Sequence, residues 1–169
     1  MKRGATLKVQ IYCDGGCRGN GQVNNIGGYG AVLICGDYIK KICGFMCDTT
    51  NNQMELLAVI KGLGALKRFD LEIEILVDSA YVCNGMNQWV HTWKKGNWYV
   101  AEQKKILNLP LWKMLDRMVE IVRERGGTVT FSKVKGHSGE KYNELADDLA
   151  NYAMNNRINS MDVKAFNNI

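Results

Sequence analysis

Proline is nearly absent from this chain, which has one proline and two histidines among 169 residues. This scarcity excludes a proline-rich linker or recognition tract, and no repeat or low-complexity segment is visible. The longest apolar run, residues 29–35, is far shorter than the roughly 20 residues needed to span a bilayer. The first residues lead into an alternating pattern without the apolar stretch of a signal peptide. We therefore expect a cytoplasmic protein that has no membrane partner.

The cysteines form no CxxC pair and no zinc ligand set with the two histidines. Six cysteines are present, at positions 13, 17, 35, 43, 47 and 83. A chain of this length does not need disulfides to fold. In a reducing compartment we expect these side chains to act as small buried hydrophobes.

The composition is that of an ordinary globular protein, with 46% apolar and 23% charged residues. The length favours one domain over residues 1–169, with a core of about residues 7–154 and a loosely held C-terminal tail at 155–169. We expect a monomer without an obligate protein partner.

Positive charge is concentrated in one part of the chain. Residues 91–135 contain ten lysines and arginines against four acids, a net charge of +6, so the remainder carries −1 of the overall +5. A basic stretch of this kind suits a polyanion such as nucleic acid, although a solvated helix face gives the same pattern.

Hydrophobic periodicity predicts alternating blocks of strand and helix. Strands are expected at residues 7–14, 29–35, 38–47, 73–77 and 128–134. Helices are expected at residues 52–69, 80–86, 108–125 and 144–154. The first helix has capping-box spacing between Asn52 and Glu55. Residues 88–105 form a polar stretch with interspersed tryptophans.

Four acidic residues stand at informative places in this pattern. Asp14 and Asp78 each close a predicted strand, Glu55 lies in the first turn of a helix, and Asp147 lies on the last helix. If the two strands are parallel neighbours, their carboxylates meet at one edge of the sheet. Clustered carboxylates repel one another unless cations intervene, and ligand sets of oxygen alone select hard ions such as Mg²⁺ or Mn²⁺.

Each of these acids also has a structural interpretation. Glu55 could serve only the capping box, Asp14 and Asp78 could be turn formers, and Asp147 with Asp148 could be a solvated helix face. Only their occurrence together with sequence motifs favours a functional site.

Five motifs occur in an order that resembles the type 1 ribonuclease H family, in its bacterial form with a basic protrusion. They are YCDGGCRGN (12–20), TTNNQME (49–55), VDSAY (77–81), QWVHTWKKGNW (88–98), and VKGHSG followed by NELADDLA (134–150). The resemblance extends from about Leu7 to Met154. It implies an α/β fold with a five-stranded mixed sheet of order 3-2-1-4-5, the first three strands antiparallel, and helices on both faces.

The resemblance also implies an activity, which is hydrolysis of the RNA strand of an RNA/DNA hybrid with two metal ions, Mg²⁺ or Mn²⁺. The products would carry 5′-phosphate and 3′-hydroxyl ends. Asp14, Glu55, Asp78 and Asp147 would bind the metals, and His137 would sit on a mobile loop near the cleaved phosphate and help with proton transfer or product release. His91 lacks such a context and is expected on the surface.

Substrate contacts follow from the same resemblance. Cys17, Asn20 and Asn52 would read 2′-hydroxyls in the minor groove. Phosphates of the DNA strand would be held by Thr50 and Asn51 and by Lys94 and Lys95 of the protrusion. Trp89, Trp93 and Trp98 would form apolar walls against sugar rings, although a tryptophan cluster also suits simple packing. The chain departs from the family in a longer loop after Asn20 and in Ala80, where many relatives have glutamine.

Two other functions remain open at this stage. The chain could be a non-catalytic hybrid-binding module on the same fold. It could also be another member of the wider superfamily, such as a transposase or a junction resolvase, which would act on DNA alone.

Overall fold

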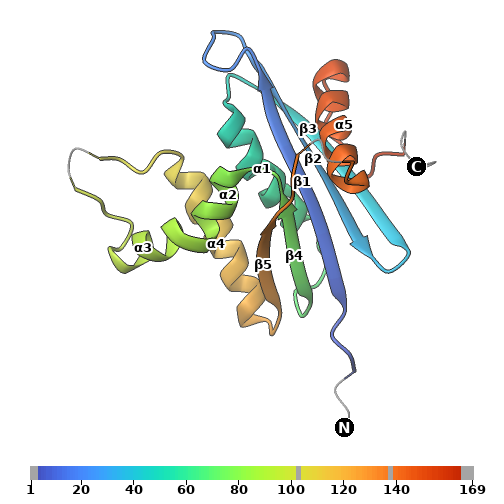
Figure 1. Cartoon of the computed structure of the whole chain (residues 1–169), viewed down its shortest axis with the longest axis vertical. Helices are drawn as coiled ribbons and strands as arrows, with labels where there is room; N and C mark the ends of the chain where they lie inside the picture. The colour runs from blue at the N-terminus through green and yellow to red at the C-terminus, as the bar shows by residue number, and fades with distance from the viewer. Residues whose placement is uncertain (1–3, 102–103, 137–138, 165–169) are drawn as a thin grey trace.

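The sheet forms around one long central strand, β1. The computed structural model describes residues 4–101, 104–136 and 139–164. The strands are β1 (Lys8–Arg18), β2 (Ile26–Cys35), β3 (Tyr38–Cys47), β4 (Glu72–Val77) and β5 (Thr128–Lys133). Their order is β3-β2-β1-β4-β5, with β1 to β3 antiparallel and β4 and β5 added in parallel (Figure 1). The predicted strand order and directions are confirmed.

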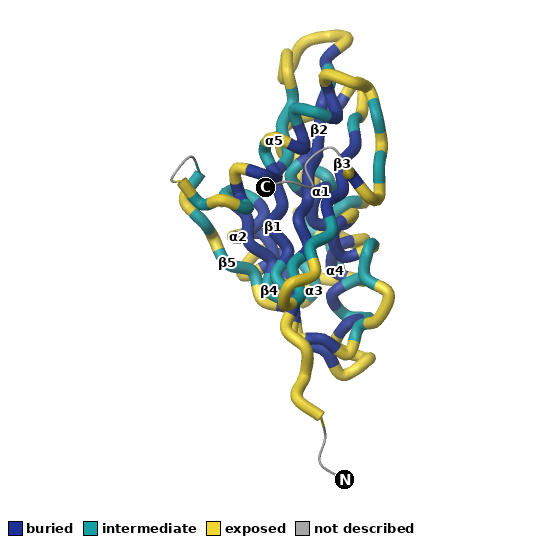
Figure 2. Tube along the Cα trace, turned by 90° about the vertical axis from the view of Figure 1, so that its right-hand side faces the viewer, coloured by how far each residue is buried: buried dark blue, intermediate teal, exposed yellow. Residues whose placement is uncertain are grey.

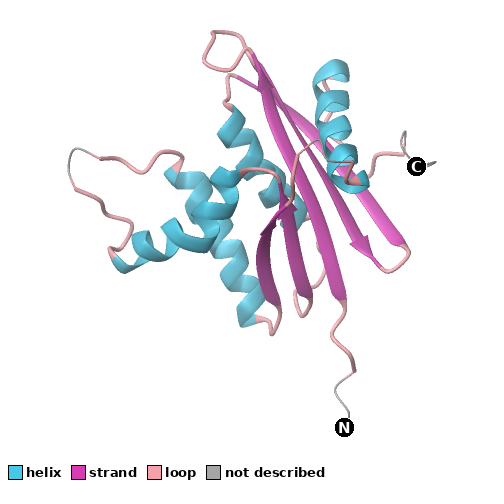
Figure 3. Cartoon of the chain, viewed as in Figure 1, coloured by secondary structure: helices cyan, strands magenta, loops and turns pink. Residues whose placement is uncertain are grey.

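Helices cover both faces of this sheet, as Figure 3 shows. They are α1 (Asn51–Gly64), α2 (Ala80–Asn84), the π-helical turn η1 (Gly85–Trp89), α3 (Val90–Lys95), α4 (Leu109–Glu124) and α5 (Lys141–Asn156). The α5 helix lies on one face, while α1 and α4 lie on the other. Among the described helices, none is long and apolar enough to cross a membrane.

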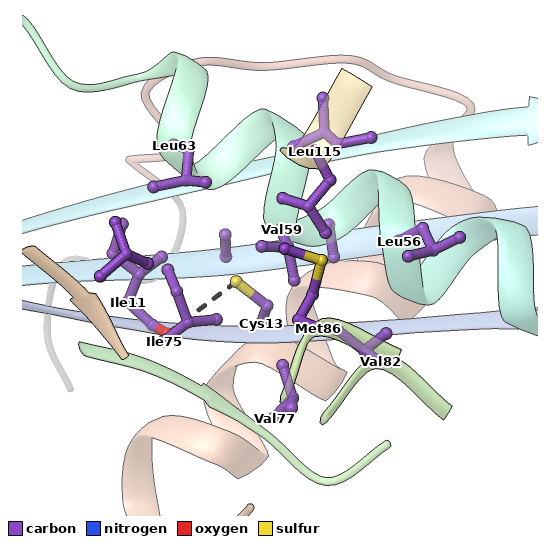
Figure 4. Close-up of a cluster of buried hydrophobic side chains, with 14 of the residues drawn as sticks. Ile11, Cys13, Leu56, Val59, Leu63, Ile75, Val77, Val82, Met86 and Leu115 are labelled. Atoms are coloured by element: carbon purple, nitrogen blue, oxygen red, sulfur yellow. Dashed lines mark hydrogen bonds between the residues drawn. The ribbon is translucent and has the colours of Figure 1, made fainter. Parts of the chain in front are cut away.

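The larger core lies between α1 and the centre of the sheet. Leu56, Val59 and Leu63 of α1 pack on Ile11 and Cys13 of β1, with side chains of β4 and α4 closing the cluster (Figure 4). A smaller core joins α5 to the opposite face. Buried residues therefore follow the strands in Figure 2, whereas the turns at their ends are largely exposed.

Two glycines of β2 allow α5 to approach the sheet closely. A Cβ atom at Gly28 would overlap the carbonyl oxygen of Ala150, and one at Gly30 would overlap that of Ala146. Because any side chain at these positions would push the helix outward, the glycines fix the distance of α5, and hence of Asp147, from the sheet.

Several predicted boundaries were wrong. Asp14 does not end its strand, because β1 continues to Arg18, which pairs with Ile26 of β2. The first helix is capped by the Thr50 side chain, which accepts a hydrogen bond from the Gln53 amide, so the predicted Asn52–Glu55 capping box does not form. That helix ends at Gly64, not near Phe69.

The first part of the polar stretch, up to Lys95, is helical, since α2, η1 and α3 follow one another without a break from Ala80 to Lys95. The helical spacing of the apolar residues in this segment is obscured by the π-helical turn. One extra residue in that turn shifts the register of the helix. Gly85 begins this turn, and a Cβ atom there would overlap the Trp112 ring.

The part of the C-terminal tail that the structure describes, up to residue 164, is held against the sheet, contrary to the prediction of a loose tail. Ser160 and Cys43 exchange backbone hydrogen bonds of 2.9 and 3.0 Å, and the Val163 amide donates to the Lys41 carbonyl at 2.9 Å. Val163 is buried. The described part of the tail therefore covers the β3 edge of the sheet, which would otherwise expose unpaired backbone groups.

Candidate active site

Asp14 and Asp78 lie side by side at the end of the parallel ladder between β1 and β4. The parallel pairing of β1 with β4 ends at Cys13 and Val77, and the two aspartates follow these partners directly. Asp14 is buried and Asp78 is partly exposed. The prediction that the two carboxylates meet at one edge of the parallel ladder is confirmed.

Glu55 reaches the same place from α1. A Cβ atom at Gly15 would overlap the backbone of Met54, so this glycine lets the first turns of α1 contact β1 beside Asp14. One carboxylate oxygen from each of Asp14, Glu55 and Asp78 lies within 4.8 Å of the others. Three acids that are distant in the sequence thus converge on one point.

This crowding changes the acidity of the group. The pKa of Asp14 is raised to about 8, first by burial and then by the negative charge of Asp78 and by a hydrogen bond with the Asp147 carboxyl. Burial also raises the pKa of Glu55 well above its usual range, with further contributions from Asp14 and Asp78. Without a counter-ion, the cluster therefore holds protons near neutral pH.

The donor set suits a hard divalent cation. All of the converging atoms are carboxylate oxygens, and Glu55 Oε2 is buried without a hydrogen-bond partner. An unsatisfied buried carboxylate oxygen is costly, and a cation would satisfy it while removing the repulsion. Mg²⁺ and Mn²⁺ are ions of this class.

Asp147 lies on α5, and its carboxyl group forms a hydrogen bond with that of Asp14. Asn151, one turn further along, donates to Asp147 Oδ1 at 3.3 Å and accepts from Arg18 Nη2 at 3.0 Å. Sequence reasoning missed Asn151 and Arg18, although the spacing of four residues between Asp147 and Asn151 on a helix indicates contact.

His137 lies outside the described residues. Its neighbour Gly136 is described, and a Cβ atom at Gly136 would stand 2.9 Å from Asp78 Oδ2. The segment that carries the VKGHSG motif thus passes close to the carboxylates at this residue.

The predicted contacts at the start of α1 form a small hydrogen-bonded rim. The Cys17 amide donates to Asn51 Oδ1 at 2.6 Å, and the Asn51 amide donates to Asn20 Oδ1 at 3.0 Å. Thr50 and Asn52 are exposed beside them. A surface hollow of about 430 Å³ is lined by residues of this rim, Leu107 and Asn108. The structure therefore brings these five predicted residues together.

A chain of polar side chains behind this hollow was missed from the sequence. Gln53 Nε2 donates to Asn108 Oδ1 at 3.2 Å, and Asn108 Nδ2 donates to the Tyr81 hydroxyl at 3.0 Å. Trp112 Nε1 donates to the same hydroxyl at 3.2 Å. The only signal was the position of Gln53 and Tyr81 within two of the motifs.

The tryptophans form one cluster around fully buried Trp112. Trp93 lies 5.6 Å from Trp112, 6.1 Å from Trp89 and 6.3 Å from Trp98 between ring centroids. Packing is therefore part of their role, while Trp89 remains 36% exposed and accessible to a ligand. His91 is exposed, as expected.

The two lysines of α3 differ. Lys94 Nζ lies 3.1 Å from Asp116 Oδ2 and 2.6 Å from Glu120 Oε1, so it is held in ion pairs with α4. Lys95 is exposed. Of the two lysines predicted to contact phosphates, Lys95 is the one that forms no such ion pair among the described residues.

The family model of RNase H matches residues 6–155. A ribonuclease H of Ruthia magnifica subsp. Calyptogena magnifica is 48% identical over 147 residues, which cover 87% of this chain and 95% of the relative. A ribonuclease H of Clostridium botulinum (strain Hall) is 49% identical over 148 residues, with the same two coverages.

Solved structures agree with these relatives. LC9-RNase H1, a type 1 RNase H with the type 2 active-site motif, superimposes with a TM-score of 0.78 at 31% identity, covering 95% of this chain and 79% of that one. LC11-RNase H1 in complex with RNA/DNA hybrid gives a TM-score of 0.63 at 25% identity, covering 88% and 98%. The chain therefore belongs to the ribonuclease H family, in its type 1 branch.

Proposed function

We propose that this enzyme cuts the RNA strand of RNA/DNA hybrids with two divalent metal ions, Mg²⁺ or Mn²⁺, and leaves 5′-phosphate and 3′-hydroxyl ends. The observation that carries the proposal is the convergence of Asp14, Glu55 and Asp78 within 4.8 Å. Crystallisation of LC11-RNase H1 with an RNA/DNA hybrid supports the same substrate class here.

Asp14, Glu55, Asp78 and Asp147 are the residues that would hold the metals. When bound, a pair of such cations supplies activation of an attacking water and neutralises charge on the leaving 3′ oxygen. The carboxylates would bind such cations in their deprotonated form, because a cation offsets both the burial and the charge of Asp78 that raise the pKa of Asp14.

His137 would hold or transfer a proton beside the cleaved phosphate. An imidazole titrates near neutral pH, so it can both accept and release a proton under working conditions. Gly136 next to Asp78 supports the proximity of this segment to the carboxylates.

Selection of the hybrid would come from the rim at the start of α1. Cys17, Asn20 and Asn52 would meet 2′-hydroxyls of the RNA strand. Thr50 and Asn51 would hold phosphates of the DNA strand, together with Lys95 of α3. Trp89, Trp93 and Trp98 would offer apolar surface to sugar rings, whereas Lys94 would contribute mainly through its ion pairs.

A cleavage assay tests the proposal. A 5′-fluorescein RNA strand is annealed to DNA and incubated with pure protein in Mg²⁺, Mn²⁺ or EDTA, with duplex DNA, duplex RNA and single-stranded RNA as controls. We expect cleavage of the hybrid alone, only with metal, and fragments whose masses carry 5′-phosphate and 3′-hydroxyl ends. Intact RNA in every metal lane would contradict the proposal.

The same assay separates the two alternatives. Binding of the hybrid without cleavage would indicate a non-catalytic module, and cleavage of duplex DNA would indicate a nuclease of another superfamily branch.

A further inference from the structure

A row of polar side chains on α5 faces β1 next to the carboxylates. It consists of Asp147, Asn151 and Asn155, which follow one another at intervals of four residues and therefore lie on one side of the helix. Arg18, the last residue of β1, donates to Asn155 Oδ1 at 2.6 Å and to Asn151 Oδ1 at 3.0 Å. We call these three α5 residues the polar row.

The polar row matches β1 in length. Side chains alternate along a strand, so Asp14 and Arg18, four residues apart, point to the same face of the sheet. This is the face on which α5 packs (Figure 1). Four strand residues span roughly 13 Å, and the eight helical residues from Asp147 to Asn155 span about 12 Å. Asp147 therefore meets Asp14 at one end of the row while Asn155 meets Arg18 at the other.

Arg18 sets the orientation of the Asn151 amide. A guanidinium group can only donate hydrogen bonds, so Asn151 must turn Oδ1 toward it. Its Nδ2 then faces Asp147, where it donates to the backbone carbonyl oxygen at 3.1 Å and to Oδ1 at 3.3 Å. Both hydrogens of this nitrogen are thus used by Asp147, and none is left for a phosphate group.

The hydrogen bond to Asp147 Oδ1 restricts the carboxylate. The last torsion angle of an aspartate side chain is broad, so a carboxylate without an anchor samples many orientations. Rotation of the Asp147 carboxylate would break its bond to Asn151. A ligand that is oriented before the cation arrives loses less conformational entropy when it binds.

We propose that Asn151 is a positioning residue, whose amide, oriented by Arg18, holds the Asp147 carboxylate where it can share a cation with Asp14. The inference rests on the proposed function, because the orientation of Asp147 matters to the reaction only if the carboxylates bind metal. Asn151 acts through Asp147 and is itself neither a metal ligand nor a substrate contact.

Cleavage kinetics give the first test. Asn151→Ala should lower kcat on the hybrid by about tenfold or more and leave KM within about twofold, because hydrogen-bond partners of metal ligands affect the metal site and not substrate binding. Alanine favours helix, so the variant should fold and keep its Tm. The control is Asn156→Ala. Asn156 Nδ2 also donates to a backbone carbonyl one turn earlier, that of Tyr152 at 2.9 Å, and this control should cut at the unmodified rate.

Metal binding without substrate gives a second readout. Mn²⁺ is titrated into each protein, and the free ion is followed by its electron paramagnetic resonance signal. Asn151→Ala should raise the Mn²⁺ Kd by about tenfold, whereas Asn156→Ala should leave it within about twofold. Asn151→Gln should recover most of the affinity and of kcat, because glutamine carries the same amide and reaches a carboxylate four residues earlier on a helix.

Double variants identify the route of the effect. In the Asp147→Ala background, Asn151→Ala should change kcat and the Mn²⁺ Kd by less than about twofold, because the carboxylate on which it acts is gone. Arg18→Met should weaken Mn²⁺ binding less than Asn151→Ala does. In the Asn151→Ala background, Arg18→Met should have no further effect.

Three results would overturn the proposal. One is the same kcat and Mn²⁺ Kd for Asn151→Ala as for Asn156→Ala. Another is an effect of Asn151→Ala that persists at full size in the Asp147→Ala background. A change in KM alone would make Asn151 a substrate contact instead. Failure of the proposed function is a separate result, since the unmodified protein would then leave the hybrid intact while the Mn²⁺ titrations still test Asn151.

Discussion

The carboxylates of Asp14 and Asp78 are neighbours because each follows the last residue of the parallel β1–β4 ladder, Cys13 in one strand and Val77 in the other. The parallel ladder thus sets their separation, since Asp14 lies within β1 and Asp78 is the first residue after β4. A rigid pair of this kind is suited to fixing the geometry of a bound cation.

Replacement of one of these carboxylates tests its role without changing its shape. Asp78→Asn should lower the hybrid cleavage rate by about a thousandfold or more, because loss of one metal ligand removes several kcal/mol of transition-state stabilisation. Hybrid binding in EDTA should be unchanged or tighter, since one negative charge near the phosphates is gone. The control is Asp148→Asn, an exposed carboxyl on α5, which should cut at the unmodified rate. Equal activity of Asp78→Asn and Asp148→Asn would refute the metal-ligand role.

The raised pKa of Asp14 predicts how stability depends on pH. Because the pKa is about 8 in the folded protein and lower when unfolded, the folded state binds the extra proton between these values. The metal-free protein should therefore lose stability as pH rises from about 4 to 8. Asp14→Asn removes the contribution of Asp14 to this effect, while that of Glu55 remains, and should stabilise the metal-free protein at pH 8 by about 1–3 kcal/mol, while abolishing cleavage.

Thermal unfolding in EDTA at pH 5.5 and pH 8 measures this difference. Mg²⁺ should raise the Tm of the unmodified protein more at pH 8 than at pH 5.5, because at the lower pH protons compete for the same oxygens. Asp37→Asn at the exposed β2–β3 turn is the control and should show the pH dependence of the unmodified protein. The explanation fails if the pH dependence of Asp14→Asn is as large as that of the unmodified protein.

The two adjacent glycines of β1 offer a matched pair for the contact between β1 and α1. A Cβ atom at Gly15 would overlap the backbone of Met54 and Glu55, whereas at Gly16 nothing lies within 4 Å. Gly15→Ala should therefore push the start of α1 away, cost about 1–3 kcal/mol and lower the cleavage rate by displacing Glu55. Gly16→Ala should change neither the free energy of unfolding nor the rate appreciably. Urea unfolding and the cleavage assay check both, and similar values for the two variants would show that α1 does not depend on this contact.

Much of this architecture could be predicted from the sequence. In β1 apolar and polar residues alternate, and in α4 apolar residues recur at helical spacing, because each element buries one face. Such patterns can be found in the local sequence. The position of Asp14 beside Asp78 could be predicted from the parallel crossover, although β1 continues beyond Asp14.

What the sequence did not reveal depended on contacts between distant residues. The first helix begins at Asn51, one residue earlier than expected, because Thr50 and not Asn52 supplies the capping oxygen. The helical nature of residues 88–95 was hidden by the π-helical turn, and it is stabilised by packing of Trp89 and Trp93 around Trp112. The sequence around Lys94 could not predict its ion pairs, because Asp116 and Glu120 belong to another helix, α4.

The two lysines of α3 should have separable effects. Lys94→Ala leaves buried Asp116 without its cation and should cost about 1–3 kcal/mol of stability. Lys95→Ala should leave the Tm unchanged but weaken hybrid binding, and should reduce the slope of log Kd against log salt by about 1. Titrations of a labelled hybrid in Ca²⁺ at several salt concentrations measure this slope. An unchanged slope for Lys95→Ala would exclude its phosphate contact.

The last prediction concerns the tail along the β3 edge. Val163 is 4% exposed, and its amide bonds the Lys41 carbonyl, so its side chain anchors the strand-like segment that carries Ser160. Val163→Ala should destabilise the protein by about 1 kcal/mol, whereas Met161→Ala, at a side chain 48% exposed, should have little effect. Chemical denaturation measures both. Because the tail touches neither Asp14 nor Glu55 in the described structure, cleavage at a temperature where both variants are folded should be unchanged. A loss of activity in Val163→Ala at that temperature would instead mean that the β3 edge and the carboxylate site are coupled through α5.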